Sequence, residues 1–477
     1  MNEIVFLVLL VLAILCLLDL RTGMYLTLIA GFVQDPLRKV IEEAPVIYSA
    51  IVILFAAFTF VGATQTGALQ RFRAIPEWNS RLIVPIGLFA LIVALQSFAA
   101  LVNTGSVFIA AIGLLVYLAP FPALLLAYSF ASSPGRVYAF FWLYVVVCAL
   151  MVSGVYLAWL GVDWEILQSV GEPLIVYSLD TGEALELPCG FLRSPEVAAW
   201  HAATGACIVL MLGLSKGRKD TGVLTVALVL FFVGAVMLTG RRKFLLEIGI
   251  FLPALWFLLW RFKMATGRIL YLLFGVALVS VVVLATGVVE TNTREAFQAP
   301  VTRGENRVEE ILNRVENLTV GAVPYIIEAN GWLGSGAGTG SGGAQYYGGG
   351  EERIGLSAEG GLAKILAEIG IPGALAFLWL CSRFAGNAWR TLGRISQGER
   401  EAAHLTMGIA AFLAATGIVF VSAHQVYSDP FILLLIGTCF GFILASHRFV
   451  EKEAVPHGSA MQPESRSRMR GFNPGKR

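Results

Sequence analysis

The chain has 477 residues, of which 57% are hydrophobic and only 14% are charged, and its mean hydropathy is +0.76. These values exclude an ordinary water-soluble protein and are typical of a chain whose main solvent is lipid. The net charge of +2 is uninformative as a total, because the distribution of Lys and Arg among loops matters more in a membrane protein. No nucleic-acid partner is expected.

Apolar runs long enough to span a bilayer recur between short charged or glycine-rich breaks. They do not alternate in polarity as the strands of a membrane barrel do. The predicted fold is therefore an all-α polytopic integral membrane protein with about 12 or 13 transmembrane helices. The predicted spans are Ile4–Leu20, Met24–Val33, Val46–Ala63, Leu82–Leu101, Val107–Phe130, Tyr138–Leu160, Val197–Leu214, Val223–Leu238, Phe244–Trp260, Ile269–Val289, Leu362–Leu380, Leu405–Val421 and Phe431–Ser446.

Four regions follow from this pattern. We expect an N-terminal transmembrane bundle over 1–289, a long outer loop with short helices over 290–360, C-terminal transmembrane helices over 361–447, and a basic tail over 448–477. The first run has no basic segment before it, so we expect it to be retained as a helix. Met24–Val33 is short for a span and is a candidate re-entrant segment, which leaves the side of the N-terminus open.

The distribution of basic loops predicts the orientation. If the basic tail is cytoplasmic, alternation places four other basic loops on the same side, which the positive-inside rule favours. Those loops carry Arg71, Arg73 and Arg81; Lys216, Arg218 and Lys219; Arg261, Lys263 and Arg268; and Arg383, Arg390, Arg394 and Arg400. The acidic loop near 163–186 and the long loop over 290–360 then lie on the outer face.

One tight turn departs from this rule. Arg241, Arg242 and Lys243 follow Thr239-Gly240 in a turn that alternation places on the outer face. Three adjacent cations there call for an anionic partner. The first interpretation is snorkelling to lipid phosphates; the second is a phosphate-binding site.

The basic residues of the long outer loop are all arginines. It contains five Arg, ten Glu and no Lys, and guanidinium groups suit geometric recognition of phosphate or carboxylate. Residues 303–316 are predicted to form an amphipathic helix with Arg303, Arg307 and Arg314 on one face. That face is a candidate substrate-binding surface, together with Arg353. The alternative is a solvated face with incidental ion pairs.

A glycine-rich segment, Gly331–Gly343, follows in the same loop. It lacks the Gly-Lys-Ser/Thr ending of a phosphate-binding loop and follows no strand of a βαβ unit, which excludes a dinucleotide fold. Glycine here either lets backbone approach a bulky substrate, lets the loop move, or serves as a flexible linker.

The remaining chemistry-bearing residues are few. Five of the six cysteines lie in apolar runs, and only Cys189 is in a substantial loop, so no disulfide framework is predicted. No His, Cys or Asp cluster has metal-ligand spacing, so we expect metal-independent chemistry without a cofactor. His201 is expected to be a satisfied polar contact. His424 and Asp429, in a short outer turn, are weaker candidates for the same cavity.

Four segments in order resemble a known family. Cys189–Trp200 resembles a Gly-x-Phe-x-x-Pro-Asn motif that opens a middle helix, and Thr239–Arg242 resembles a Ser-Arg turn. Leu318–Gly340 is similar to an outer-loop stretch that precedes a Gly-x-Gly turn, and Leu362–Gly373 to a return segment with a Glu-x-Gly-x-x-Gly signature. Together they resemble the O-antigen polymerase and O-antigen ligase superfamily of the bacterial inner membrane.

The resemblance implies a glycosyltransferase. Its donor is a glycan linked through pyrophosphate to undecaprenol, its acceptor is another glycan, and a chain-length regulator is a possible partner. It implies a multi-pass inner-membrane protein with a periplasmic long loop and a cytoplasmic C-terminus. Arg241 and Arg242 are then candidate catalytic cations that hold the leaving pyrophosphate, with Lys243, Arg193 and Glu196 as candidate substrate-binding residues. For Arg193 and Glu196, the alternative is a mutual ion pair or a helix cap.

Two departures from the family pattern bear on the acceptor. Glu359 stands nine residues before Glu368, where the ligases carry a histidine, and Glu196 stands where the middle motif usually has Asn. The first favours a polymerase, in which Glu359 is the candidate base; the alternative for Glu359 is an ordinary charge at a helix N-terminus.

Three other functions remain open. A ligase would use the same donor and a different acceptor. A transporter or flippase is less favoured, because the sequence shows no inverted repeat with paired broken helices and few ionisable residues inside the spans. The third is a non-catalytic assembly scaffold.

Overall fold

The computed structural model describes residues 2–41, 48, 50–69, 81–170, 175–177, 184–216, 222–264, 267, 322–341, 360–422 and 425–451. Its α-helices are α1 Asn2–Leu15, α2 Leu20–Val40, α3 Ile51–Gln65, α4 Ile83–Thr104, α5 Val107–Leu118, α6 Pro120–Phe130, α7 Pro134–Trp159, α8 Pro195–Lys216, α9 Gly222–Leu238, α10 Leu245–Arg261, α14 Ala322–Asn330, α16 Gly361–Ile395, α17 Arg400–Ser422, α18 Pro430–Ala445 and α19 His447–Glu451. Short 3-10 turns lie at η4 Glu165–Leu167, η6 Arg242–Phe244 and η7 Gln425–Ser428. An antiparallel hairpin pairs β1 Ile175–Tyr177 with β2 Ala184–Glu186.

The prediction of an all-α polytopic membrane protein is confirmed. Six helical segments in the described ranges are long and apolar enough to cross a membrane, namely Ile83–Thr104, Val107–Phe130, Pro134–Trp159, Pro195–Ser215, Gly361–Ile395 and Arg400–Val421. The helices α3, α9 and α18 are shorter and apolar. The predicted span Ile269–Val289, the predicted helix over 303–316 and almost all of the tail lie outside the described residues.

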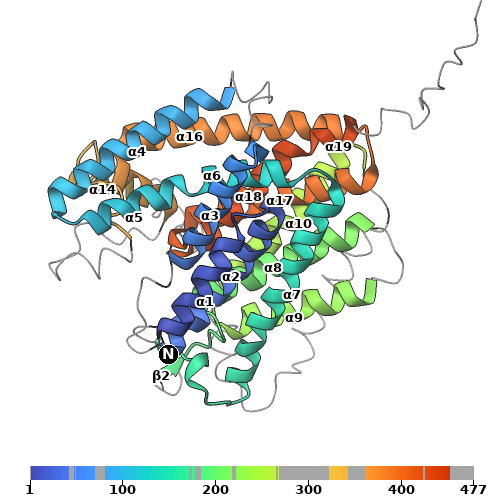
Figure 1. The fold of residues 1–477 in the computed structure, drawn as a ribbon, viewed down its shortest axis with the longest axis horizontal. Helices are drawn as coiled ribbons and strands as arrows, with labels where there is room; N and C mark the ends of the chain where they lie inside the picture. Colours follow the sequence, from blue (N-terminus) through green and yellow to red (C-terminus); the bar gives the residue numbers. More distant parts are fainter. Residues whose placement is uncertain are drawn as a thin grey trace, which may run out of the picture.

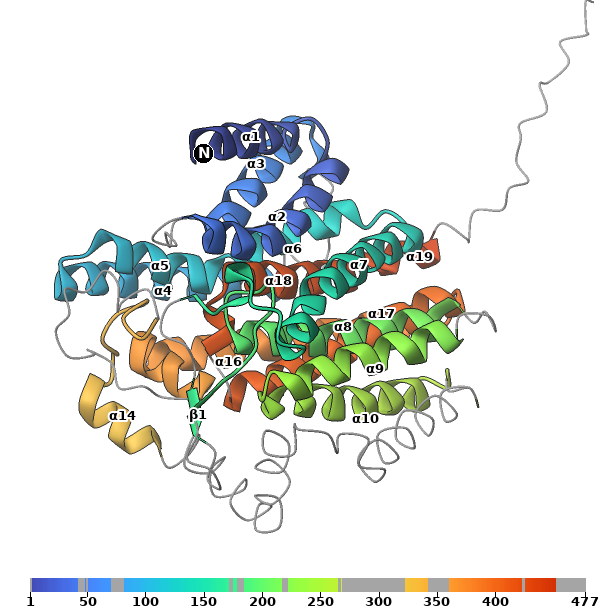
Figure 2. The ribbon, with the colours of Figure 1, turned by 90° about the horizontal axis from the view of Figure 1, so that it is seen from below.

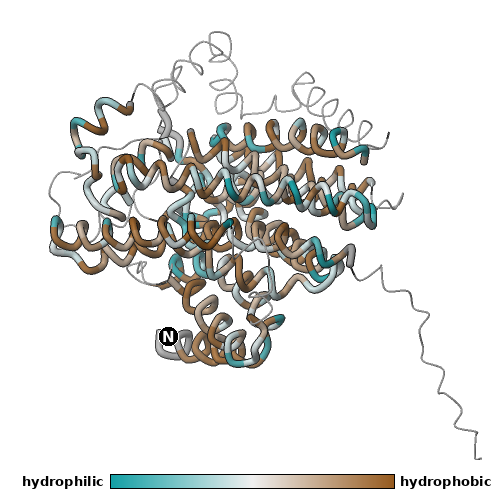
Figure 3. Tube along the Cα trace, turned by 90° about the horizontal axis from the view of Figure 1, so that it is seen from above, coloured by the Kyte–Doolittle hydropathy of each residue, from teal (hydrophilic) through white to brown (hydrophobic). Residues whose placement is uncertain are grey.

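The helices pack around α8. In the apolar stretch of this helix 89% of the residues are buried inside the protein, compared with 28% in the apolar stretch of α4. Around α8 lie α7, α9, α10 and α17, while α1 and α3 stand to one side of the bundle (Figures 1 and 2). Apolar residues run along the outer helices (Figure 3), and Phe98 of α4 is 65% exposed. Such apolar outer surfaces are suited to lipid, with the polar groups turned inward.

The second helix is longer than the apolar run predicted there. Met24–Val33 lies inside α2, which has 21 residues from Leu20 to Val40 and is not among the six segments of the described ranges that are long and apolar enough to cross a membrane. Asp19 caps its first turn by accepting a hydrogen bond from the backbone N–H of Thr22. The helix continues through Gln34 and Asp35 because both side chains are buried inside the protein, each 1% exposed. Their polarity therefore does not end the helix at the edge of the apolar run.

The helix α16 is broken near its start. Gly370 has φ 64° and ψ −171°, which separates a short segment from the long helix that follows. A helical bond to the carbonyl of Glu368 would need an N–H at position 372, and Pro372 has none. The predicted span Leu362–Leu380 is thus a short entry segment followed by a long helix that ends at Ile395.

Candidate functional site

A cluster of charged residues joins the ends of several helices. It contains the last turn of α2, the segment before α8, the turn between α9 and α10, and the short segment between α17 and α18. These connections are far apart in the sequence, and the turn between α9 and α10 and the turn between α17 and α18 were both predicted to lie on the outer face.

Arg193 is the centre of this cluster. Its guanidinium lies 2.6 Å from Oδ2 of Asp429 and 3.9 Å from Oδ1 of Asp35. The backbone N–H of Arg193 also donates to Oδ2 of Asp35, at 3.1 Å. Burial opposes the charged form of the guanidinium, but Asp429 and Asp35 outweigh it and raise the pKa of Arg193. Arg193 is therefore a fixed and permanently charged group.

Asp429 has a second role. Its Oδ1 accepts hydrogen bonds from the backbone N–H groups of Phe431 and Ile432, at 2.7 and 3.2 Å, and so caps α18. One carboxylate thus satisfies the start of a helix and holds the guanidinium of Arg193. The side chain is 1% exposed, so both interactions are sheltered from water.

Glu196 and Arg241 form a second ion pair, at 2.6 Å. Of the two alternatives given for Arg193 and Glu196, a mutual ion pair or a helix cap, the ion pair is therefore wrong, because each residue pairs with a partner from another segment. Arg241 follows Gly240, whose φ of +67° allows the tight turn out of α9. The Nε of Arg241 is buried without a hydrogen-bond partner in the described part of the chain.

The turn carries two other cations. Lys243 lies over the ring of Phe244, with its Nζ 5.7 Å from the ring centroid. Arg242 opens η6, and its side chain is outside what the structure describes. Arg241 therefore joins this turn to α8, oriented by the carboxylate of Glu196.

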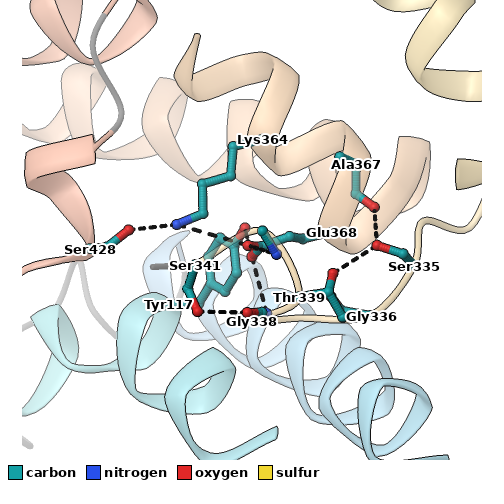
Figure 4. A network of polar contacts seen from close by, with 11 residues as sticks. Tyr117, Ser335, Gly336, Gly338, Thr339, Ser341, Lys364, Ala367, Glu368 and Ser428 are labelled. Carbon is teal, nitrogen blue, oxygen red and sulfur yellow. Dashed lines mark hydrogen bonds and ion pairs between the residues drawn. The ribbon is translucent and has the colours of Figure 1, made fainter. Parts of the chain in front are cut away.

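A second polar cluster surrounds Glu368 in the entry segment of α16 (Figure 4). Its Oε2 accepts from the hydroxyl of Tyr117 at 2.7 Å and from the N–H of Gly338 at 3.2 Å. Its Oε1 accepts from the N–H of Gly340 at 3.0 Å and lies 3.8 Å from Nζ of Lys364. The carboxylate is 1% exposed and makes contacts with both oxygens, so it holds the glycine-rich segment against α5 and α16.

The glycine-rich segment also supplies hydrogen-bond partners to the backbone at the break in α16. The backbone N–H groups of Ser335 and Gly336 donate to the carbonyls of Ala367 and Glu368, at 2.8 and 3.0 Å. In return, the N–H of Ile371 donates to the carbonyl of Trp332, at 3.0 Å. Few backbone hydrogen bonds are therefore lost at the break, because the neighbouring glycine-rich segment replaces the missing helical partners.

Glycine is required for this close packing. Gly338 has φ +94°, and a Cβ there would lie 2.3 Å from the carbonyl oxygen of Ile109 in α5. Gly336 has φ +115°, and its Cβ would lie 2.6 Å from Ala100 of α4. Over residues 331–341 the glycines let the backbone approach the protein's own helices, a role that was not among the three interpretations of this segment.

The turn between α17 and α18 joins the two clusters. Ser428 accepts a hydrogen bond of 2.7 Å from Nζ of Lys364, while the next residue, Asp429, binds Arg193. The entry segment of α16, the glycine-rich segment, the start of α8 and the turn after α9 are therefore parts of one continuous polar network. Asp429, a weaker candidate from the sequence, is part of this network, and His424 lies outside the described residues.

The structure thus describes part of the predicted set. Arg193, Glu196 and Arg241 take part in the charged cluster, and Lys243 lies in the same turn as Arg241. Five predicted residues lie outside the described ranges: Arg303, Arg307, Arg314, Arg353 and Glu359. His201 is a satisfied contact, since its Nδ1 is hydrogen-bonded to the hydroxyl of Tyr144 at 2.9 Å.

Sequence reasoning did not select Asp35, Tyr117, Lys364 or Glu368 as site residues. Three of them are charged residues within or beside predicted apolar runs, and that was the available signal, since burying a charge beside lipid is costly without a partner. Tyr117 carried no such signal.

No family model and no curated protein matches this chain. Among solved structures, it is similar to a chain from the work described as "Structural coordination of polymerization and crosslinking by a peptidoglycan synthase complex". The identity is 14% and the TM-score is 0.38, over 78% of this chain and 99% of that chain. A likeness at this level carries no argument about function.

Proposed function

We propose that this protein polymerises undecaprenyl-pyrophosphate-linked oligosaccharide repeat units on the outer face of a bacterial inner membrane. One observation supports the proposal above others. The four segments that resemble motifs of the polymerase and ligase superfamily meet in one polar network, through the pairs Arg241–Glu196, Lys364–Ser428 and Arg193–Asp429 and through the contacts of Ser335 with Ala367. Segments with unrelated roles would not need to meet.

The cations of the network suit a pyrophosphate leaving group. Arg193 and Arg241 have side chains 20% and 21% exposed, so each is held by carboxylates and still reaches the edge of the buried region. Cations oriented in advance stabilise developing negative charge without reorganising. We assign the leaving pyrophosphate to Arg241 and Arg242, and donor binding to Arg193, Lys243 and the outer-loop residues Arg303, Arg307, Arg314 and Arg353. Glu196 orients Arg241.

The acceptor needs a base. We assign Glu359, which directly precedes Gly360, the N-cap of α16. In the proposed step the acceptor hydroxyl gives its proton to the Glu359 carboxylate while its oxygen bonds to the anomeric carbon of the donor. The bond from that carbon to the pyrophosphate oxygen breaks, and the pyrophosphate leaves with the electron pair.

Transport of lipid-linked glycan is the second candidate, and the break in α16 favours it. Buried charges beside a broken helix are a feature of secondary transporters. In this chain, however, the carboxylate of Glu368 is engaged by Tyr117, Lys364 and two glycine N–H groups. A group that couples ion binding to motion must release such partners, so the arrangement suits a structural anchor better.

The test uses cells that lack this protein, complemented with wild type, Arg241→Ala, Glu359→Gln or the control Arg400→Ala. Arg400 is an exposed cation at the start of α17, in a predicted cytoplasmic loop. We expect single repeat units on the lipid carrier in the deletion and in the first two variants, and a full ladder of glycan lengths with wild type and the control. Long polymer that persists on its lipid carrier would identify a ligase, and loss of all glycan from the outer face would identify a transporter.

A further inference from the structure

A cavity of about 450 Å³ lies at the opposite end of α2 from the charged cluster. It is lined by the start of α2, the turn after α3, the end of α6 and the start of α7. Arg21 and Arg136 line it from two different helices. Over the 21 residues of α2, the rise of a helix separates the two sites by roughly 30 Å. The cavity lies where one helical segment long and apolar enough to cross a membrane, Val107–Phe130, ends and the next, Pro134–Trp159, begins. The ends of such segments lie at the level of a headgroup layer.

The electrostatics of the cavity favour an anion. Neither Arg21 nor Arg136 is in an ion pair with another residue that the structure describes. Arg136 lies in the first turn of α7, and the N-cap of that helix, Ser133, makes no side-chain hydrogen bond to it. Two guanidinium groups thus face one space, one of them from the first turn of a long helix, and such an arrangement is suited to phosphate.

Two further side chains define the cavity. Asp19 lines it as well, but one oxygen of its carboxylate already accepts from the N–H and hydroxyl of Thr22, at 3.2 and 3.4 Å, and so is used to cap α2. Ser129 also lines it, is only 4% exposed, and its hydroxyl has no hydrogen-bond partner in the described ranges. A buried hydroxyl left without a partner costs free energy, and a bound polar group would relieve that cost.

We propose that this cavity binds a phosphate group, and that the source is the headgroup of an anionic membrane lipid. The lipid is favoured over a soluble phosphate because the cavity opens where the ends of spanning helices meet the headgroup layer. The proposal is independent of the function proposed for the charged cluster, which lies at the other end of the bundle.

The test measures retention of lipid by the intact protein. Purified full-length protein in detergent is titrated with phosphatidylglycerol or phosphatidylcholine and followed by native mass spectrometry, and a second series uses radiolabelled inorganic phosphate. The variant is the double substitution Arg21→Gln/Arg136→Gln. The matched control is Arg383→Gln/Arg400→Gln, which removes the same charge from exposed positions on α16 and α17.

We expect wild type to retain phosphatidylglycerol in preference to phosphatidylcholine, and the double variant to lose affinity by about tenfold or more. The control should bind as wild type does. If inorganic phosphate binds to wild type and not to the double variant, while phosphatidylglycerol does not bind, the phosphate site is supported and its ligand is a soluble phosphate instead of a lipid headgroup. Equal binding of phosphatidylglycerol by wild type and the double variant would overturn the proposal, and so would an equal loss of binding in the control. If the double variant does not fold, the single variant Arg21→Gln, at an exposed position, replaces it in the test.

Discussion

Arg193 and Asp429 form an ion pair of 2.6 Å that joins the segment before α8 to the first turn of α18. Because Asp35 of α2 lies on the same guanidinium, three segments far apart in sequence are fixed by one side chain. The polar end of the bundle is therefore organised by a single cation between two buried carboxylates. Removal of that cation should destabilise the packing of all three segments, not only the ion pair.

Replacement of Arg193 by Ala should destabilise the protein by about 3–5 kcal/mol, because two buried carboxylates lose their shared cation. The measurement is the apparent Tm of the purified protein in detergent. The double variant Arg193→Ala/Asp429→Asn should be more stable than Arg193→Ala alone, since it removes one of the unpaired charges. A Tm for Arg193→Ala equal to that of wild type would show that the ion pair has no structural role.

Substitution of Glu368 by Gln should release the glycine-rich segment. The amide has one acceptor oxygen, whereas the carboxylate receives the hydroxyl of Tyr117 and the N–H groups of Gly338 and Gly340. We expect faster hydrogen exchange of the amides over 332–341 and loss of the glycan ladder. Glu328→Gln, at an exposed position of α14, is the control; unchanged exchange in Glu368→Gln would contradict the tether.

Alanine at Gly338 should destabilise the packing of the glycine-rich segment by about 1–3 kcal/mol, because the residue has a positive φ and no room for a Cβ beside Ile109. Gly87→Ala is the matched control, since a Cβ at this position of α4 meets nothing within 4 Å. In a helix this second substitution should stabilise by up to about 1 kcal/mol. The two apparent Tm values should shift in opposite directions, and a parallel shift would count against the packing argument.

The thiol of Cys189 should react slowly in the folded protein. Burial raises its pKa, and the nearby ammonium of Lys39, 3.4 Å from Sγ, offsets only part of that shift. Since the thiolate is the reactive form, raising the pH from 7 to about 8.5 should produce little labelling by a maleimide. Mass spectrometry of the peptide with and without denaturant checks this. Rapid labelling of the native protein at pH 7 would mean that Cys189 is exposed or ionised.

Much of the fold could be predicted from composition and periodicity. The spans over Leu82–Leu101, Val107–Phe130 and Tyr138–Leu160 were placed within a few residues of α4, of α5 with α6, and of α7. The prediction fell short at α2 and α16, where polar residues and a glycine interrupt the apolar pattern but the chain remains helical or bends inside the protein. In both places neighbouring segments supply partners that no local pattern reveals.

The sequence by itself determined that the chain is an all-α membrane protein, because the cost of placing side chains in lipid depends on composition and each spanning helix satisfies its own backbone. Only the tertiary structure decided which charges meet. The local pattern paired Arg193 with Glu196 as near neighbours, yet the structure pairs Arg193 with Asp429 and Asp35, and Glu196 with Arg241. Inside the bundle a buried charge must be matched by whichever opposite charge the helix packing brings within reach, and that packing is a property of the whole chain.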